Sequence, residues 1–212
     1  MRVGIIGANG KLGTLVTQEC VERGHDVVAI VRSGECGTKG VKNVLKKDLF
    51  ELEKEDVKDC DLIISTFGGG LNNPPEINRK AIGRLSDIVQ NTETYLVVVG
   101  GAGTLFTDHL HTQRVYETKE HPDFLREISR NICLGYLEMK EKPNVNYTFV
   151  CPSLFFDFEG QKKGIYQVGT EEEVIFSSKH ESRISYRDFA RALVDEGEDR
   201  RYKGKCITIC EV

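Results

Sequence analysis

Three glycines at intervals of three residues follow a short apolar run near the N-terminus. The run covers residues 3–6, and the glycines are Gly7, Gly10 and Gly13. Together they predict a buried strand, a tight turn and a helix, an arrangement that brings backbone N–H groups and a helix N-terminus against a pyrophosphate. We expect Gly7 to allow the sharp turn, Gly10 to let the backbone approach the phosphates, and Gly13 to let the helix pack on the strand.

The residues after the glycines complete a strand–helix–strand unit. Gly24 stands where a left-handed C-terminal cap would end the helix, and Val27–Val31 is a continuous apolar run typical of a central parallel strand. Glycine-rich turns are common in proteins, so it is this context that makes the motif indicative of dinucleotide binding. One face of the helix carries the apolar residues Leu12, Leu15, Val16 and Cys20.

The end of the second strand favours one dinucleotide over another. Chains that prefer NAD usually place a carboxylate there, whereas this chain has Arg32 and Ser33, with no acid before Glu35. A guanidinium and a hydroxyl suit the 2′-phosphate of NADP. Asp26 begins the strand and lies roughly 15–20 Å from its end, too far to replace that acid. The sequence therefore favours NADP(H) over NAD(H), with an ordinary exposed arginine as the alternative interpretation.

Strand and helix patterns alternate along the rest of the chain. One helix spans the apolar positions from Ile77 to Val89, and another begins near Phe124. The alternation predicts an α/β fold of the Rossmann type: a doubly wound, mostly parallel sheet with a small C-terminal substrate-side region, in a single domain covering residues 1–212. The further predicted strands are Val41–Leu45 at an edge, Asp61–Thr66, Tyr95–Gly100, Tyr147–Cys151 and Cys206–Cys210.

Several strand ends carry residues that suit a cofactor. An acid at Asp48 could accept from the adenine amino group, and small residues at Gly100 and Gly101 would allow close approach to the nicotinamide. The alternative is a set of loops that need only glycine, proline or a helix cap. The candidate binding residues at these ends are Asp48 and Leu49, then Ser65, Thr66, Phe67 and Gly68, then Gly100 and Gly101, and finally Cys151 and Pro152.

Five segments together resemble a known family: Gly7–Gly13, Arg32-Ser33, Val98–Gly103, Tyr147–Pro152 and Ile184–Ala190. They are similar to the atypical short-chain dehydrogenase/reductases, and within them to a group of proposed NADH-flavin reductases related to biliverdin-IXβ/flavin reductases and NmrA-like proteins. The resemblance implies cofactor contacts at Gly7, Asn9, Gly10, Lys11, Leu12, Gly13, Arg32, Asp48, Leu49, Thr66, Phe67, Gly68 and Gly101.

Two of these segments have features of their own. Asn9 replaces the commoner threonine of the glycine turn and still offers a side-chain hydrogen bond. In the last segment Ser185 and Asp188 resemble a capping box at the start of a helix, with Asp in place of the usual Glu, so we interpret Ile184–Ala190 as structural.

Reductases of the wider superfamily use a Tyr-x-x-x-Lys pair, and Tyr136 with Lys140 matches that spacing. Tyr136 lies too near the far end of its helix for this role, and the expected tyrosine position falls near Phe124, which has no ionisable group. We therefore expect Thr104 to orient the acceptor as the catalytic residue, with His109 or His111 as possible proton donors.

Two functions fit this sequence. The first is an NAD(P)H-dependent reductase that passes a hydride directly to a flavin or a related planar acceptor, which needs little more than two rings held face to face. The alternative is an NmrA-like protein that senses NADP(H) and regulates a partner without turnover. The segment from Thr104 to Asp123 is long for an α/β connection and predicts a substrate lid.

Composition excludes several other classes. The net charge of −4 and the lack of basic clusters interleaved with aromatics argue against nucleic acid as a partner. The apolar runs are strand-length, which predicts no membrane span, and the first strand leaves no room for a signal peptide. Seven cysteines without Cys-x-x-Cys or zinc spacing predict free thiols in a cytoplasmic protein without a structural metal. The expected partner is a small-molecule acceptor, and the oligomeric state stays open.

Overall fold

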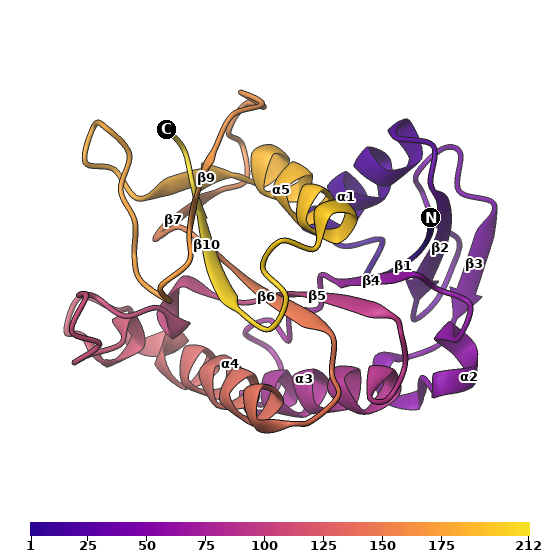
Figure 1. Cartoon of the computed structure of the whole chain (residues 1–212), viewed down its shortest axis with the longest axis horizontal. Coiled ribbons are helices and arrows are strands. Elements are labelled where there is room, and N and C mark those ends of the chain that lie inside the picture. The colour runs from indigo at the N-terminus through magenta and orange to yellow at the C-terminus, as the bar shows by residue number, and fades with distance from the viewer.

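The computed structural model describes all residues, 1–212, and shows a central sheet between two helix layers (Figure 1). The eight strands run in the order β3-β2-β1-β4-β5-β6-β10-β8, and every neighbouring pair is parallel except β10 with β8. This is the doubly wound, Rossmann-type arrangement that the sequence predicted. The sheet strands are β1 (Arg2–Ile6), β2 (Asp26–Val31), β3 (Asn43–Lys46), β4 (Leu62–Ser65), β5 (Tyr95–Val99), β6 (Tyr147–Pro152), β8 (Gln167–Gly169) and β10 (Cys206–Cys210).

Helices cover both faces of the sheet. On one face α1 packs beside α5, and on the other α3 packs beside α4, as Figure 1 shows. The core is divided accordingly into two clusters of 23 and 22 buried residues, so neither face dominates the burial. The helices are α1 (Lys11–Glu22), α2 (Lys54–Val57), α3 (Glu76–Val89), α4 (Asp123–Glu141) and α5 (Tyr186–Asp199), with short 3₁₀ turns at Leu49–Glu51, Ala102–Thr104 and Val115–Glu117.

The chain between β6 and α5 forms the smaller C-terminal region. Two short strands, β7 (Phe155–Asp157) and β9 (Arg183–Ser185), pair in parallel outside the main sheet. β8 returns to the main sheet as its edge strand, antiparallel to β10. The sequence predicted this region only in outline, because three-residue strands carry no periodicity.

Local signals fixed several element ends. Gly24 has a φ of 78° and follows α1 in a left-handed cap, with its N–H bonded to the Val21 oxygen and the His25 N–H bonded to the Cys20 oxygen. The predicted edge strand at Val41–Leu45 is displaced, since β3 begins at Asn43. Its register opposite β2 pairs Asn43 with Val28, which leaves Val41 in the connection.

Two further observations concern the cysteines and the helices. All seven cysteines are free thiols, and the sulfur atoms of Cys151 and Cys206 lie 3.7 Å apart in the core. None of the helices combines the length and the apolar composition that crossing a membrane requires.

Candidate functional site: two clefts joined at the glycine turn

Two clefts open along the edge where the parallel strands end. The outer cleft, of about 470 Å³, lies at the ends of β1, β2, β3 and β4, and the inner cleft, of about 330 Å³, lies at the ends of β4 and β5. They meet at Gly10, Thr66, Phe67 and Gly68, which line both. Of the predicted residues, the outer cleft also contains Gly7, Asn9, Arg32, Ser33, Asp48 and Leu49, and the inner cleft also contains Lys11, Leu12, Ser65 and Gly100.

The glycine turn between the clefts has the geometry that the sequence predicted. Gly7 has a φ of 79°, and its carbonyl accepts from the Gly10 N–H at 2.8 Å. A Cβ built on Gly13 would lie 2.0 Å from the Gly7 oxygen, so only glycine lets α1 pack this closely on the strand. Gly10 is the N-cap of α1 and has no side chain to bond the first helical N–H groups. Those donors and the positive end of the helix dipole therefore face the junction of the clefts.

Thr66 and Asn9 hold this turn from either side. The Thr66 hydroxyl donates to the Ile6 oxygen at 2.9 Å, which ties the end of β4 to the end of β1. Asn9 donates from Nδ2 to the Glu35 oxygen at 2.9 Å and accepts from the Gly37 N–H at 3.3 Å. Both polar side chains are thus engaged by the protein, and Asn9 fixes the loop that follows β2.

Residues at the ends of β2 and β3 give the outer cleft its polar character. Arg32 and Ser33 are exposed at its rim, directly after β2. Asp48 accepts from the Phe50 N–H at 2.9 Å, so its carboxylate caps the 3₁₀ turn at Leu49–Glu51. Lys47 is paired with Asp56 at 2.6 Å, and that bond holds the pKa of the Asp56 carboxyl below its usual range.

The inner cleft is walled by aromatic residues that the sequence did not single out. Phe156 from β7 and Tyr186 from α5 line it, with ring centroids 3.9 Å apart and an interplanar angle of 27°. Phe158 meets the Tyr186 ring edge-on at 5.3 Å, and the Lys11 ammonium lies 4.6 Å from the Phe158 centroid. We call Phe156, Phe158 and Tyr186 the aromatic wall. The sequence feature that could have indicated this wall is Tyr186, because it directly follows the predicted helix cap at Ser185.

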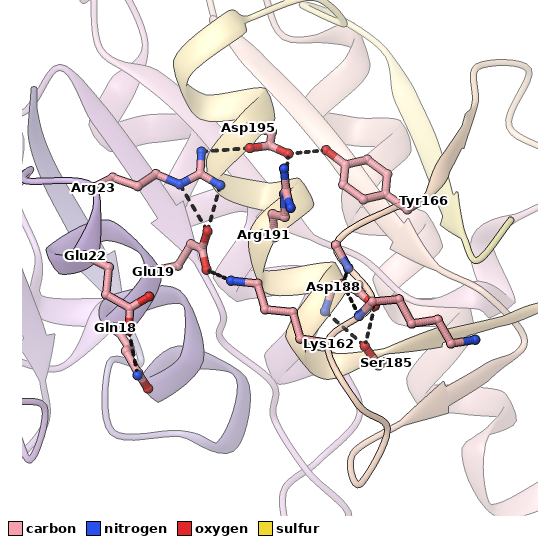
Figure 2. A network of polar contacts seen from close by, with 12 residues as sticks. Gln18, Glu19, Glu22, Arg23, Lys162, Tyr166, Ser185, Asp188, Arg191 and Asp195 are labelled. Atoms are coloured by element: carbon pink, nitrogen blue, oxygen red, sulfur yellow. Dashed lines mark hydrogen bonds and ion pairs between the residues drawn. The ribbon is translucent and has the colours of Figure 1, made fainter.

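A strap formed by residues 158–166 carries Phe158 and is held on α1 and α5 (Figure 2). Lys162 pairs with Glu19 at 2.6 Å, and the Tyr166 hydroxyl donates to Asp195. Burial alone would raise the pKa of Glu19, but Lys162 and Arg23 outweigh it and lower that pKa. The strap and its charged contacts therefore support one side of the aromatic wall.

The predicted capping box at the start of α5 forms only in part. The Ser185 hydroxyl accepts from the Asp188 N–H at 3.0 Å, as expected. The fully buried Asp188 carboxylate accepts instead from the N–H groups of Lys163 and Gly164, at 3.0 and 2.8 Å, and from the Ser185 hydroxyl. Its partners are the strap and the Ser185 hydroxyl rather than the Ser185 backbone N–H.

Several residues predicted at the site lie elsewhere. Thr104 is 1% exposed, its hydroxyl has no hydrogen-bond partner, and it lines neither cleft, which corrects its expected place beside the acceptor. Cys151 and Pro152 are buried in β6, because that strand continues through both residues. Gly101 and Gly13 also lie outside the linings of the clefts. Gly100 does line the inner cleft, but a Cβ there would lie 2.3 Å from the Phe149 ring, so its small size serves packing.

Neither residue of the Tyr-x-x-x-Lys match lines a cleft. Tyr136 is fully buried, and its hydroxyl donates to Glu172 at 2.6 Å, while Lys140 binds the same oxygen at 2.9 Å. Burial raises the pKa of Tyr136 well above its usual range. Phe124 is 68% exposed, and the residue of α4 that lines the inner cleft is Ile132. Phe124 therefore lies outside the cleft, and Ile132, which lines it, has no ionisable group either.

The segment predicted as a lid is anchored to the C-terminal region. Phe106 bridges Arg114 and Glu173, and the His111 ring stacks on Phe106 with centroids 4.2 Å apart. A third cavity of about 370 Å³ lies beneath this segment and is lined by Thr107, Val115, Thr118, Glu120, His121, Pro122, Leu154, Val174 and Phe176. His121, rather than the expected His109 or His111, reaches this cavity, and burial lowers its pKa.

Comparison with known proteins agrees with this geometry. A sequence model of a family described as NAD(P)H-binding matches residues 7–199. YwnB of Bacillus subtilis (strain 168), an uncharacterized protein, is 37% identical over 99% of this chain and 98% of its own. SP1627 of Streptococcus pneumoniae TIGR4, a proposed NADH-flavin reductase, is 35% identical with a TM-score of 0.94 over 100% of both chains.

A more distant structure shares the fold alone. ChuY of Escherichia coli O157:H7, an anaerobillin reductase, is 17% identical with a TM-score of 0.73, over 100% of this chain and 97% of its own. Because the family match extends over most of the molecule and includes the glycine turn and both clefts, this chain belongs to the NAD(P)H-binding family.

Proposed function

We propose that this protein is an NAD(P)H-dependent oxidoreductase that passes a hydride directly to a flavin or a related planar acceptor and prefers NADP(H) to NAD(H). The observation that carries the proposal is the pair of clefts joined at the glycine turn. The outer cleft bears Arg32 at its rim, whereas most residues that line the inner cleft are hydrophobic and include aromatic rings. A dinucleotide bound across the junction would have its 2′-phosphate near Arg32 and its nicotinamide ring near the aromatic residues.

The residues present fit such a cofactor. The uncapped N-terminus of α1 would hold the pyrophosphate, because its first N–H groups have no side-chain partner. Arg32 and Ser33 would bind the 2′-phosphate, for which a guanidinium fork is well suited. The bound nicotinamide supplies a hydride, and Phe67, Ile132 and Phe156 would exclude water from the ring.

Direct transfer is supported by the position of the Tyr-x-x-x-Lys match. Tyr136 and Lys140 of α4 are both bound to Glu172, and neither residue lines a cleft. An electron-poor acceptor ring needs orientation more than a proton in the transfer step. The name given to SP1627 supports a flavin as this acceptor. The third cavity offers further apolar surface for a planar ring.

The test is NADPH and NADH oxidation with FMN, FAD, riboflavin and quinones added in turn. We expect turnover with at least one flavin and a lower KM for NADPH than for NADH. Arg32→Ala should narrow that preference by about one to two decades, the value of a charge-assisted contact. Equal affinity of the unmodified protein for the two dinucleotides would contradict the NADP(H) preference. NADPH binding without oxidation of any acceptor would instead favour a redox sensor.

A further inference from the structure

Tyr186 reaches the inner cleft from an element that has no part in the glycine turn. It is the first residue of α5, and the Ser185 cap fixes where that helix begins. Its ring is held between Phe156 and Phe158, so the side chain is restrained on two sides. No other tyrosine lines either cleft.

The hydroxyl of Tyr186 forms no hydrogen bond within the protein. Other tyrosine hydroxyls of the molecule are bound, as that of Tyr166 is to Asp195 and that of Tyr136 is to Glu172. For Tyr186, burial is the single influence on its pKa, and it raises that pKa. A phenol of this kind stays protonated at neutral pH and is suited to donating a hydrogen bond, and poorly suited to giving up its proton.

The aromatic wall borders the inner cleft, which is where the proposed function has the nicotinamide bind. Phe156 and Tyr186 both line that cleft. An acceptor ring that lies on the nicotinamide would therefore be held against these two side chains.

We propose that the Tyr186 hydroxyl donates a hydrogen bond to a ring carbonyl oxygen of the acceptor, and that it selects acceptors carrying such a carbonyl. This inference rests on the proposed reductase function. In the transfer step the C–H bond of the dihydronicotinamide breaks, and its electron pair and hydrogen move to the acceptor ring. The acceptor gains negative charge, which the hydrogen bond stabilises at the carbonyl oxygen. The Tyr186 O–H bond stays intact, and water supplies the proton afterwards.

The test compares Tyr186→Phe with the unmodified protein. The variant keeps the ring and its stacking on Phe156, so we expect an unchanged melting temperature. We expect kcat/KM for riboflavin to fall about ten- to one-hundred-fold, which is the usual contribution of one hydrogen bond to a charged group. A phenazinium dye, which is planar but lacks a ring carbonyl, should be reduced at the unmodified rate after correction for its uncatalysed reaction.

A second measurement does not depend on turnover. Riboflavin binding to the protein–NADP⁺ complex, in which no hydride is available, should weaken several-fold in Tyr186→Phe, while NADP⁺ binding should not change. The chain contains no tryptophan, so flavin fluorescence reports binding without that background. Tyr202→Phe is the matched control, because Tyr202 follows the opposite end of α5 and lines neither cleft.

The outcomes separate the two claims. If Tyr186→Phe binds and reduces riboflavin like the unmodified protein, the role of Tyr186 is refuted and the reductase function stands. If the variant loses NADP⁺ affinity instead, the hydroxyl serves the cofactor and the inference is wrong. If the unmodified protein neither binds riboflavin beside NADP⁺ nor oxidises NADPH with any acceptor, both proposals fail together.

Discussion

Polar side chains at the clefts divide into those that the protein already uses and those that it leaves free. The Thr66 side chain forms a hydrogen bond with the backbone at the end of β1, just before the glycine turn. The Asn9 side chain forms hydrogen bonds with the backbone of the loop after β2. Arg32 is exposed. The pKa of the Tyr186 hydroxyl is raised by burial alone, with no contribution from a bound partner. Side chains of the first kind shape the site, and those of the second kind are available for ligands.

Thr104 leads to a prediction at this scale. Its hydroxyl is buried without a partner, so Thr104→Val replaces an unsatisfied oxygen by a methyl group of similar size. We expect the free energy of unfolding to rise by up to about 1 kcal/mol, because desolvating a hydroxyl without a bond is costly. Urea unfolding measures this change. A large loss of turnover in a variant of normal stability would show that the hydroxyl reaches the acceptor.

At the scale of elements, two glycines of the turn have different roles, Gly10 in cofactor binding and Gly13 in helix packing. A Cβ at Gly10 would lie 3.1 Å from the Gly7 oxygen, a tight but tolerable contact, whereas one at Gly13 would lie 2.0 Å away. Gly10→Val should therefore fold and lose NADPH binding, because its side chain occupies the junction of the clefts. Gly13→Ala should lose about 3 kcal/mol or more of stability, because α1 must move off β1. Calorimetry with NADPH and thermal unfolding distinguish the two effects, and unchanged NADPH affinity in Gly10→Val would refute the site.

The contact between α4 and Glu172, in the chain after β8, predicts a pH dependence of stability. Burial raises the pKa of Glu172, but hydrogen bonds from Tyr136 and Lys140 outweigh it, so the folded pKa lies below the ordinary value of 4.5. A carboxyl with a depressed pKa stabilises the fold above its unfolded pKa, and that contribution is lost as the pH falls through the folded pKa. Glu172→Gln should thus be destabilised at pH 7 and approach the unmodified protein below about pH 4.

The matched control for this prediction is Glu171→Gln, since Glu171 is exposed on the same segment. Urea unfolding at both pH values measures the difference. If Glu172→Gln is destabilised by the same amount at both pH values, the effect is steric rather than ionic.

The sequence predicted the elements that depend on local patterns, and it missed features that depend on contacts between distant residues. The glycine turn, the cap at Gly24 and the apolar strands are local patterns, and the structure has them where they were expected. The aromatic wall was missed because Phe156 and Tyr186 are far apart in sequence and meet only through β7 and β9. Thr104 was misplaced for the same reason: its neighbourhood in the chain is the end of β5, but its burial depends on contacts that no spacing reveals.

In the whole molecule, one arginine joins the first helix to the last. Arg23, the C-cap of α1, pairs with Glu19 of that helix at 2.8 Å and with two residues of α5, Asp195 at 2.7 Å and Glu198 at 2.5 Å (Figure 2 shows the first two pairs). Arg23→Ala would leave three carboxylates close together without this cation. We expect a loss of about 2 kcal/mol, because removing one partner of a half-buried network leaves the other charges uncompensated.

Added salt should restore part of that stability by screening the repulsion among the carboxylates. Glu22→Ala is the control, because Glu22 only accepts from the exposed Gln18 and should change stability by less than about 0.5 kcal/mol. Urea unfolding at low and high salt measures both. If Arg23→Ala and Glu22→Ala lose the same stability and depend on salt in the same way, the ion pairs between α1 and α5 do not stabilise the fold more than an ordinary surface contact.

The last strand of the chain is an interior strand of the sheet. β10 lies between β6 and β8, and Thr208 is paired with Cys151 on one side and Gly169 on the other. β8 therefore has no partner in the sheet until β10 is in place. Deleting residues 206–212 would remove β10 and leave β8 without a neighbouring strand, whereas Val212 itself is 61% exposed.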